Sequence, residues 1–318
     1  MLSASRNFLF TVLSILWASM VVAEVSEPYT NPAITARLIS VENAVPPNAT
    51  TLSLGLDLKL EEGWKAYWRS PGEVGLPPQI SWDGSQNLAS AEILWPAPER
   101  ITAVGRQNFG YHDRVVLPLQ IHLQEAGEPA LLNASVTLLT CSEICVPHDF
   151  TLSLSLPAGV GIDLNAGDLI TEYARKVPLD PAASDIVVET AVITDDALYV
   201  TASSENRFVA PDVFPEMGPS FTFGKPDIRT NSSGTEVWAK LPLYARDAVV
   251  PLVQVTLTDG SRSVTANPAW SQDVPQAPFT LTEGRPDLSQ IMTIAMFALD
   301  FIAARTRSQA TSSPETLK

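Results

Sequence analysis

The stretch TLSLGLDLKL, residues 51–60, places leucine at every second position, with Thr, Ser, Gly, Asp or Lys between the leucines. A period of two predicts a β-strand that buries one face and exposes the other. The alternation recurs further along the chain with turn residues between its occurrences, which is typical of antiparallel strands in an all-β sandwich. In the first half of the chain these further occurrences are residues 115–121, 134–139 and 151–156.

Strand signals resume in the second half of the chain, after residues 160–181, where the sequence pattern differs. The turn-like tetrapeptide Thr258-Asp259-Gly260-Ser261 predicts a hairpin at the end of this half. We therefore predict an all-β fold of two tandem β-sandwich domains, residues 24–159 and 182–278. Residues 160–181 are predicted to be a linker with one helical stretch near 169–176. The strand signals of the second half are residues 186–193, 198–202, 220–223, 236–243 and 252–257.

Composition narrows the functional classes. Apolar residues make up 45% of the 318-residue chain and charged residues 17%, so extended disorder is not expected and two domains with real cores are. The formal net charge is −15, which argues against binding to nucleic acid or to anionic membrane surfaces.

The first 23 residues have the features of a signal peptide. Arg6 precedes an apolar run, residues 8–22, that ends in Val22-Ala23, and small residues there favour cleavage after Ala23. We therefore expect an exported, periplasmic protein in an oxidising compartment, where a cysteine pair persists as a disulfide. In the tail, residues 279–318, the apolar run 291–299 predicts a short helix, and contact of this tail with a membrane stays open.

The segment LLTCSEICVPHDF, residues 138–150, contains both cysteines of the chain, Cys141 and Cys145. A disulfide between them would stabilise the fold only weakly. Closing a loop of about five residues contributes roughly 2 kcal/mol to the free energy of unfolding, against nearly 5 kcal/mol for a loop of about 100 residues. A short loop at a strand end instead leaves the sulfurs accessible for exchange, which favours a redox-active pair. Two alternatives stay open: an inert disulfide in a binding module, and a copper or zinc site formed by Cys141, Cys145 and His148.

Three motifs carry a resemblance to a known family. They are GWKAYWRSPG at 63–72, FGYHDRVVLP at 109–118 and CSEICVP at 141–147. They occur in the same order as in the amino-terminal periplasmic domain of the thiol:disulfide interchange protein DsbD family, and the match is closer to the ScsB type, the suppressor of copper sensitivity proteins. The resemblance covers residues 24–156, and the second β domain is similar to the tandem module of the ScsB type.

The resemblance implies immunoglobulin-like sandwiches and a cysteine pair that passes electrons to periplasmic thioredoxin-fold partners, as a component of a protein-disulfide reductase without a cofactor. Cys145, which precedes Val146-Pro147, would form the mixed disulfide and Cys141 would resolve it. Phe109 stands at the place of an aromatic cap over the pair, with Tyr67 as a further packing candidate. Because the family's membrane domain is not found in this sequence, we expect a separate membrane protein to donate the electrons.

The chain departs from the DsbD pattern beside the cap aromatic. Where DsbD carries an acidic pair, this chain has Gln107 and Asn108. Tuning of the thiol pKa by those carboxylates is therefore not expected here, although Glu143 inside the cysteine loop is a possible substitute, since a nearby negative charge disfavours a thiolate.

Overall fold

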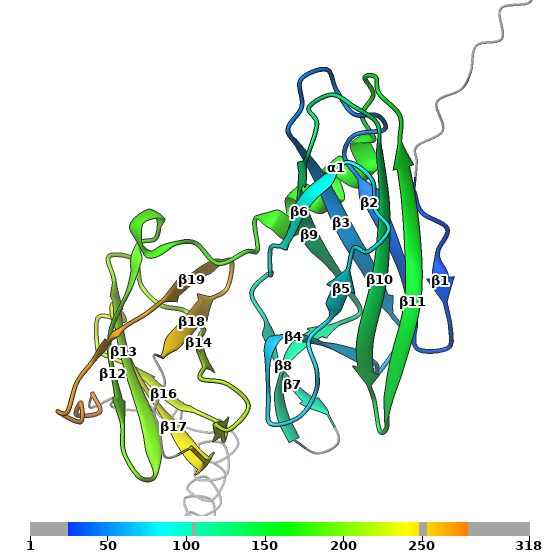
Figure 1. Cartoon of the computed structure of the whole chain (residues 1–318). Coiled ribbons are helices and arrows are strands. Elements are labelled where there is room, and N and C mark those ends of the chain that lie inside the picture. The colour runs from blue at the N-terminus through cyan, green and yellow to red at the C-terminus, as the bar shows by residue number, and fades with distance from the viewer. Residues whose placement is uncertain (1–24, 104–105, 248–252, 279–318) are drawn as a thin grey trace, which may run out of the picture. The chain divides into compact units, whose positions relative to one another are not determined.

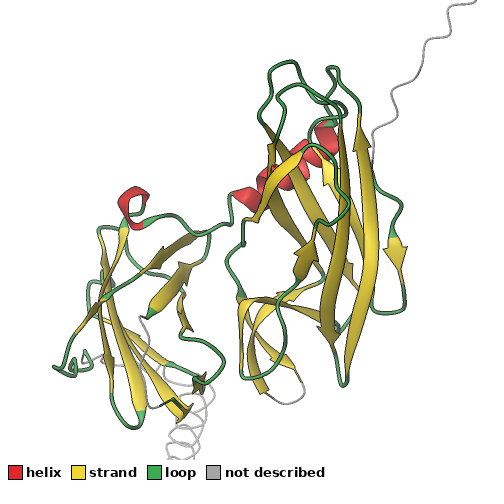
Figure 2. Ribbon diagram, in the orientation of Figure 1, coloured by secondary structure: helices red, strands yellow, loops and turns green. Residues whose placement is uncertain are grey.

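The computed structural model describes residues 25–103, 106–247 and 253–278 (Figure 1). Strands dominate these residues and form two β-sandwiches, which confirms the predicted all-β fold (Figure 2). Below, the first sandwich means strands β1 to β11 and the second means strands β12 to β20. Both lie in one compact unit that ends at Gln276. The predicted signal peptide and the predicted tail helix lie outside the described residues.

One sheet of the first sandwich is built around the alternating stretch that predicts the fold. Strand β3 spans Thr51–Leu60, as predicted, and pairs antiparallel with β2 and β9. Its five leucines are at most 4% exposed, because they all lie on the face that meets the second sheet. The strand order is β1 (Tyr29–Thr30), β2 (Ile34–Ser40), β3, β9 (Arg114–Leu123) and β6 (Leu88–Ile93).

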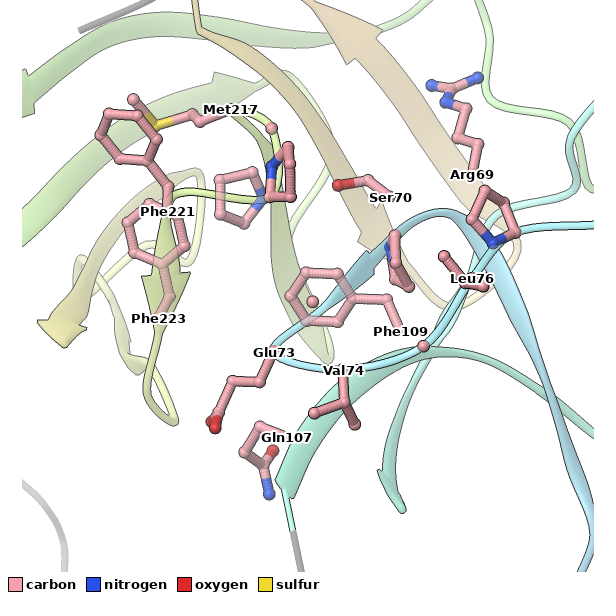
Figure 3. Close-up of a pocket in the computed structure, with 17 residues that line it drawn as sticks. Arg69, Ser70, Glu73, Val74, Leu76, Gln107, Phe109, Met217, Phe221 and Phe223 are labelled. Atoms are coloured by element: carbon pink, nitrogen blue, oxygen red, sulfur yellow. The ribbon is translucent and has the colours of Figure 1, made fainter. Parts of the chain in front are cut away.

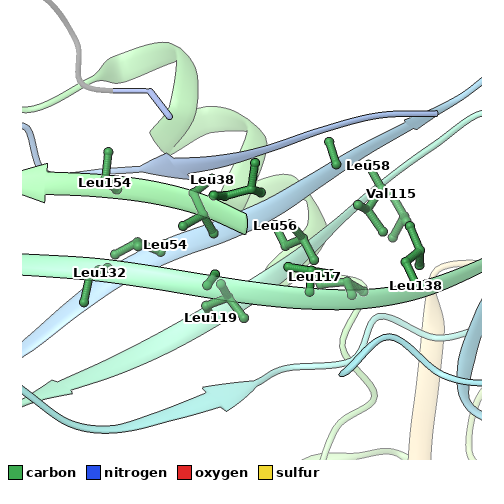
Figure 4. Close-up of a cluster of buried hydrophobic side chains, with 14 of the residues drawn as sticks. Leu38, Leu54, Leu56, Leu58, Val115, Leu117, Leu119, Leu132, Leu138 and Leu154 are labelled. Atoms are coloured by element: carbon green, nitrogen blue, oxygen red, sulfur yellow. The ribbon is translucent and has the colours of Figure 1, made fainter. Parts of the chain in front are cut away.

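The other sheet of the first sandwich contains the cysteines. Its longest pair is the hairpin of β10 and β11, which stay in antiparallel register along their whole length. Leucines and valines from both sheets interdigitate to form the core, as the ladder of side chains in Figure 4 shows. The strand order is β11 (Cys145–Leu156), β10 (Ala130–Cys141), β4 (Lys65–Gly72), β8 (Arg106–His112) and β7 (Glu99–Ala103), with β5 (Gln79–Ser81) on β10.

The predicted linker is partly a helix that packs on the first sandwich. Helix α1 spans Leu164–Ala174 and so begins earlier than the predicted stretch 169–176. It begins there because the side chain of Asp163 caps the helix by accepting hydrogen bonds from two backbone N–H groups of the first turn. Ile170 of α1 is buried against Val116 of β9. Among the described residues, no helix is long and apolar enough to cross a membrane.

The second sandwich packs a six-stranded sheet on a three-stranded one. Strand β12 has the predicted bounds, Ile186–Ile193, and the predicted turn at 258–261 joins β18 to β19 with Gly260 at a φ of 65°. The larger sheet contains β15 (Thr222–Phe223), β17 (Glu236–Ala245), β13 (Ala197–Ser204), β12 and β20 (Ala269–Trp270), with β16 (Asp227–Thr230) on β17. The smaller one contains β14 (Pro211–Glu216), β18 (Gln254–Asp259) and β19 (Arg262–Ala266), and a 3-10 turn, Pro181–Ala183, precedes β12.

Candidate redox site

The two cysteines face each other across the end of the β10–β11 hairpin. Cys141 is the last residue of β10, Cys145 is the first residue of β11, and the two are directly opposed in the register. They form a disulfide. The backbone N–H of Ser142 donates to the carbonyl of Ile144 at 2.9 Å and closes the three-residue turn between them. The hairpin therefore holds the two sulfurs next to each other at its end.

The two sulfurs differ in their surroundings. Cys141 is fully buried, whereas Cys145 is exposed at the sheet edge. Next to Cys145, the side chain of Ile144 is 63% exposed and leaves the turn open to solvent. An incoming thiolate can therefore reach Cys145 but not Cys141, and access decides which sulfur of a disulfide is attacked.

A small apolar cluster lies against the buried cysteine. It consists of Cys141, Tyr67 of β4, and Ile101 and Ala103 of β7, with Leu139 of β10 at its margin. The hydroxyl oxygen of Tyr67 is 4.0 Å from the sulfur of Cys145. Burial raises the pKa of Tyr67, so its hydroxyl stays protonated at neutral pH and can donate to that sulfur.

The segment 73–77 covers Tyr67 and is tied to strand β8. Gly75 lies on the Tyr67 ring so closely that a Cβ there would be 2.4 Å from a ring carbon, and its φ is +109°. The buried side chain of Asn108 accepts a hydrogen bond from the N–H of Val74 at 2.9 Å and donates to the carbonyl of Arg106 at 3.0 Å. Asn108 thus joins this covering segment to the β7–β8 hairpin.

Phe109 belongs to a different cluster from the cysteines. Its ring lies in the core of the first sandwich, 5.1 Å from the ring of Phe214 of the second sandwich at an interplanar angle of 88°. The structure therefore brings Tyr67, but not Phe109, to the cysteine pair. The residues of the β7–β8 hairpin that lie in the cluster of Cys141 are Ile101 and Ala103, neither of which could be assigned to the site from the sequence.

His148 has hydrogen-bond partners away from the sulfurs. Its Nδ1 accepts from the side-chain amide of Asn31 at 2.9 Å, and its Nε2 lies 2.8 Å from the hydroxyl of Thr140. Burial lowers the pKa of His148, which favours this neutral imidazole. Along β11, His148 points inward whereas Cys145 is exposed, as expected for residues three apart on a strand. Among the described residues, no three His, Cys, Asp or Glu side chains are placed to hold a metal ion.

Comparison with known proteins decides the type of the first sandwich. Residues 35–157 match the family model of the thiol:disulfide interchange protein DsbD, N-terminal. The first sandwich is a DsbD amino-terminal-type domain. This confirms the resemblance and the immunoglobulin-like class predicted for the DsbD-type domain. Residues 176–273 match a domain of unknown function, DUF8393.

One solved structure has a similar fold over most of this chain. The crystal structure of the N-terminal periplasmic domain of ScsB from Proteus mirabilis matches with a TM-score of 0.65 and 23% sequence identity. The match covers 78% of this chain and 99% of that chain, which is more than either sandwich alone. No curated protein gives a match to this sequence.

Proposed function

We propose that this protein is a periplasmic thiol–disulfide exchange protein, which passes electrons through Cys141 and Cys145 to thioredoxin-fold partners. The observation that carries the proposal is the unequal exposure of the two bonded sulfurs in a DsbD-type domain. An exposed sulfur suits the residue that bonds to a partner, and a buried neighbour suits the residue that resolves that bond.

The exchange proceeds in two steps that transfer two electrons. In the reduced protein, the Cys145 thiolate attacks one sulfur of the partner disulfide, which forms a mixed disulfide and releases the partner's other sulfur as a thiolate. Cys141, after loss of its proton, then attacks the sulfur of Cys145. The mixed disulfide breaks, the partner leaves with two thiols, and the intramolecular disulfide of the structure is restored.

The β10–β11 hairpin favours the second step. Because the two cysteines are opposed in the strand register, Cys141 stands beside Cys145 before the partner arrives. Positioning of this kind replaces an encounter between separate thiols by an intramolecular step. A separate membrane protein is our proposed electron source, and the same two steps in reverse would reduce the pair again.

Two alternatives predict different chemistry. An inert disulfide in a binding module would not exchange with a partner under mild conditions. A copper site formed by Cys141, Cys145 and His148 is not favoured, because both ring nitrogens of His148 have hydrogen-bond partners elsewhere.

Transfer of electrons to a thioredoxin-fold disulfide tests the proposal. The protein without its first 23 residues is reduced, freed of reductant and mixed with oxidised protein disulfide isomerase, whose potential is about −180 mV. We expect isomerase thiols to rise as the protein's thiols fall, in equal numbers. The double variant Cys141→Ala/Cys145→Ala is the control and should transfer nothing. An isomerase that stays oxidised in the presence of the reduced wild type would contradict the proposal.

A further inference from the structure

The β7–β8 hairpin, residues 99–103 and 106–112, has two faces with different contacts. On one face, Ile101 and Ala103 pack in the cluster of Cys141. On the other face, Arg100 and Phe109 contact strand β14 of the second sandwich. The hairpin is therefore held between the redox site and the second sandwich. A change in its position at β14 would also move the side that shields Cys141.

The polar contact on the face of Arg100 and Phe109 is a bidentate ion pair. Arg100 donates from Nε and Nη2 to the two carboxylate oxygens of Asp212, at 3.0 and 2.8 Å. Its Nη2 also donates to the carbonyl of Val213 at 2.9 Å. The side chains are only 14% and 27% exposed, so solvent screens the pair less than a surface pair.

The apolar contact inserts one residue of the second sandwich into the core of the first. Phe214 is 1% exposed and belongs to the first sandwich's core cluster, where its ring lies 5.1 Å from Phe109 and 6.3 Å from Trp68. The guanidinium of Arg100 lies over both phenylalanine rings, at 5.1 and 5.2 Å from their centroids. Such aromatic and cation–π contacts hold the Phe109 side of the hairpin in place.

A second ion pair fixes strand β4 beside the hairpin. Arg69 of β4 donates from Nε and Nη2 to the two carboxylate oxygens of Glu216, at 2.7 and 2.9 Å. Asp212, Phe214 and Glu216 occupy every second position of β14 and therefore lie on the same face of the strand. This one face supplies all three contacts. That face binds the two strands, β4 and β7, that carry Tyr67 and Ile101.

The covering segment 73–77 lacks comparable support on its outer side. A mainly apolar cavity of about 330 Å³ lies between this segment and residues 215–223 of the second sandwich, as Figure 3 shows for Val74 and Leu76 and, opposite them, Met217 and Phe221. The position of this segment over Tyr67 therefore depends on the hairpin, through Asn108, and on the contacts of the hairpin with β14.

We propose that the second sandwich positions the shield of the buried cysteine, Cys141, with Asp212 and Phe214 as the positioning residues. Their contacts hold the β7–β8 hairpin against Cys141 and, through Asn108, hold the covering segment over Tyr67. This assigns a role in the exchange reaction to a domain that has no cysteine, and it rests on the function proposed above. Loss of these contacts opens the shield without altering either sulfur.

The test measures the reaction rate of the buried Cys141 in folded variants. Asp212→Asn and Phe214→Ala are each combined with Cys145→Ala, so that Cys141 is the thiol that iodoacetamide can reach, and are compared with Cys145→Ala alone. We expect the rate of alkylation to rise by about tenfold, which corresponds to a shift of about 1.4 kcal/mol in local opening. Asp227→Asn, which loses an exposed ion pair with Arg229 inside the second sandwich, is the matched control and, combined with Cys145→Ala, should react as Cys145→Ala alone does.

Unfolding in urea separates positioning from a general loss of stability. If the contacts with β14 only stabilise the fold, the variants unfold at lower urea concentration but are alkylated at the rate of Cys145→Ala alone in buffer, and the proposal is overturned. A rate increase shared by Asp227→Asn overturns it as well. If Phe214→Ala does not fold, Asp212→Asn alone decides. Faster alkylation in the variants, together with a wild-type protein that transfers no electrons to the isomerase, would uphold the positioning role while the proposed function fails.

Discussion

Replacement of Cys141 by alanine is expected to trap a mixed disulfide between Cys145 and a thioredoxin-fold partner. The exposed Cys145 remains able to attack a partner disulfide, but this chain has no second sulfur to complete the exchange, so the mixed disulfide can only revert through the partner's freed thiolate, and excess oxidised partner opposes that loss. We expect most of the Cys141→Ala protein to be found as a covalent adduct after mixing with excess oxidised protein disulfide isomerase. Electrophoresis without reductant and mass spectrometry of the linked peptide measure the adduct.

The reciprocal variant is the control for this trap. Cys145→Ala leaves only the buried Cys141, which the partner cannot reach, so the adduct should be nearly absent. Both variants lose the same disulfide, and a difference between them therefore reports the roles of the two sulfurs rather than stability. Equal trapping by the two variants would refute the assignment of Cys145 as the attacking residue.

Gly110→Ala is expected to lower the free energy of unfolding by about 3 kcal/mol, at the upper end of the usual cost of overpacking. Gly110 lies in β8 opposite Tyr67 of β4 and Glu99 of β7. A Cβ at this position would lie 2.1 Å from the carbonyl oxygen of Ala66. The obstacle is backbone, so relief requires β4 and β8 to separate. Urea unfolding followed by tryptophan fluorescence measures the loss.

Another glycine provides the comparison. Gly167 lies within helix α1, where an added Cβ would meet its nearest atom, of Val41, at an ordinary 3.7 Å. Gly167→Ala should therefore be neutral or stabilise the protein by up to about 1 kcal/mol, since alanine favours a helix over glycine. Equal free energies of unfolding for Gly110→Ala and Gly167→Ala would contradict the close packing of β8 against β4.

Strands with clear periodicity could be predicted from the sequence. Thr51–Leu60 and Ile186–Ile193 have the predicted bounds, because alternation there reflects one buried face along an entire strand. Helix α1 begins at Leu164, earlier than the predicted stretch 169–176, because the side chain of Asp163 caps the helix there. Strands β7 and β8 escaped prediction, because their two faces are buried by different partners and their pattern is not a clean alternation.

The sequence also predicted part of the candidate site. It gave the cysteine pair and Tyr67, which lies at the sulfur of Cys145. It did not give Ile101 or the role of Asn108, because strands far apart in sequence bring these residues together. A signal for Asn108 was present in its position, where DsbD carries acidic residues. The contacts of His148 with Asn31 could not be derived from the spacing of His148 to the cysteines.

The reduction potential of the Cys141–Cys145 pair tests the central claim most directly. The protein without its first 23 residues is equilibrated with glutathione buffers of graded composition, and free thiols are counted after acid quenching. A pair that exchanges electrons with thioredoxin-fold proteins should have a potential within their span, roughly −270 to −180 mV. A potential well below about −300 mV, typical of structural disulfides, would contradict the account and leave an inert cross-link in a binding module.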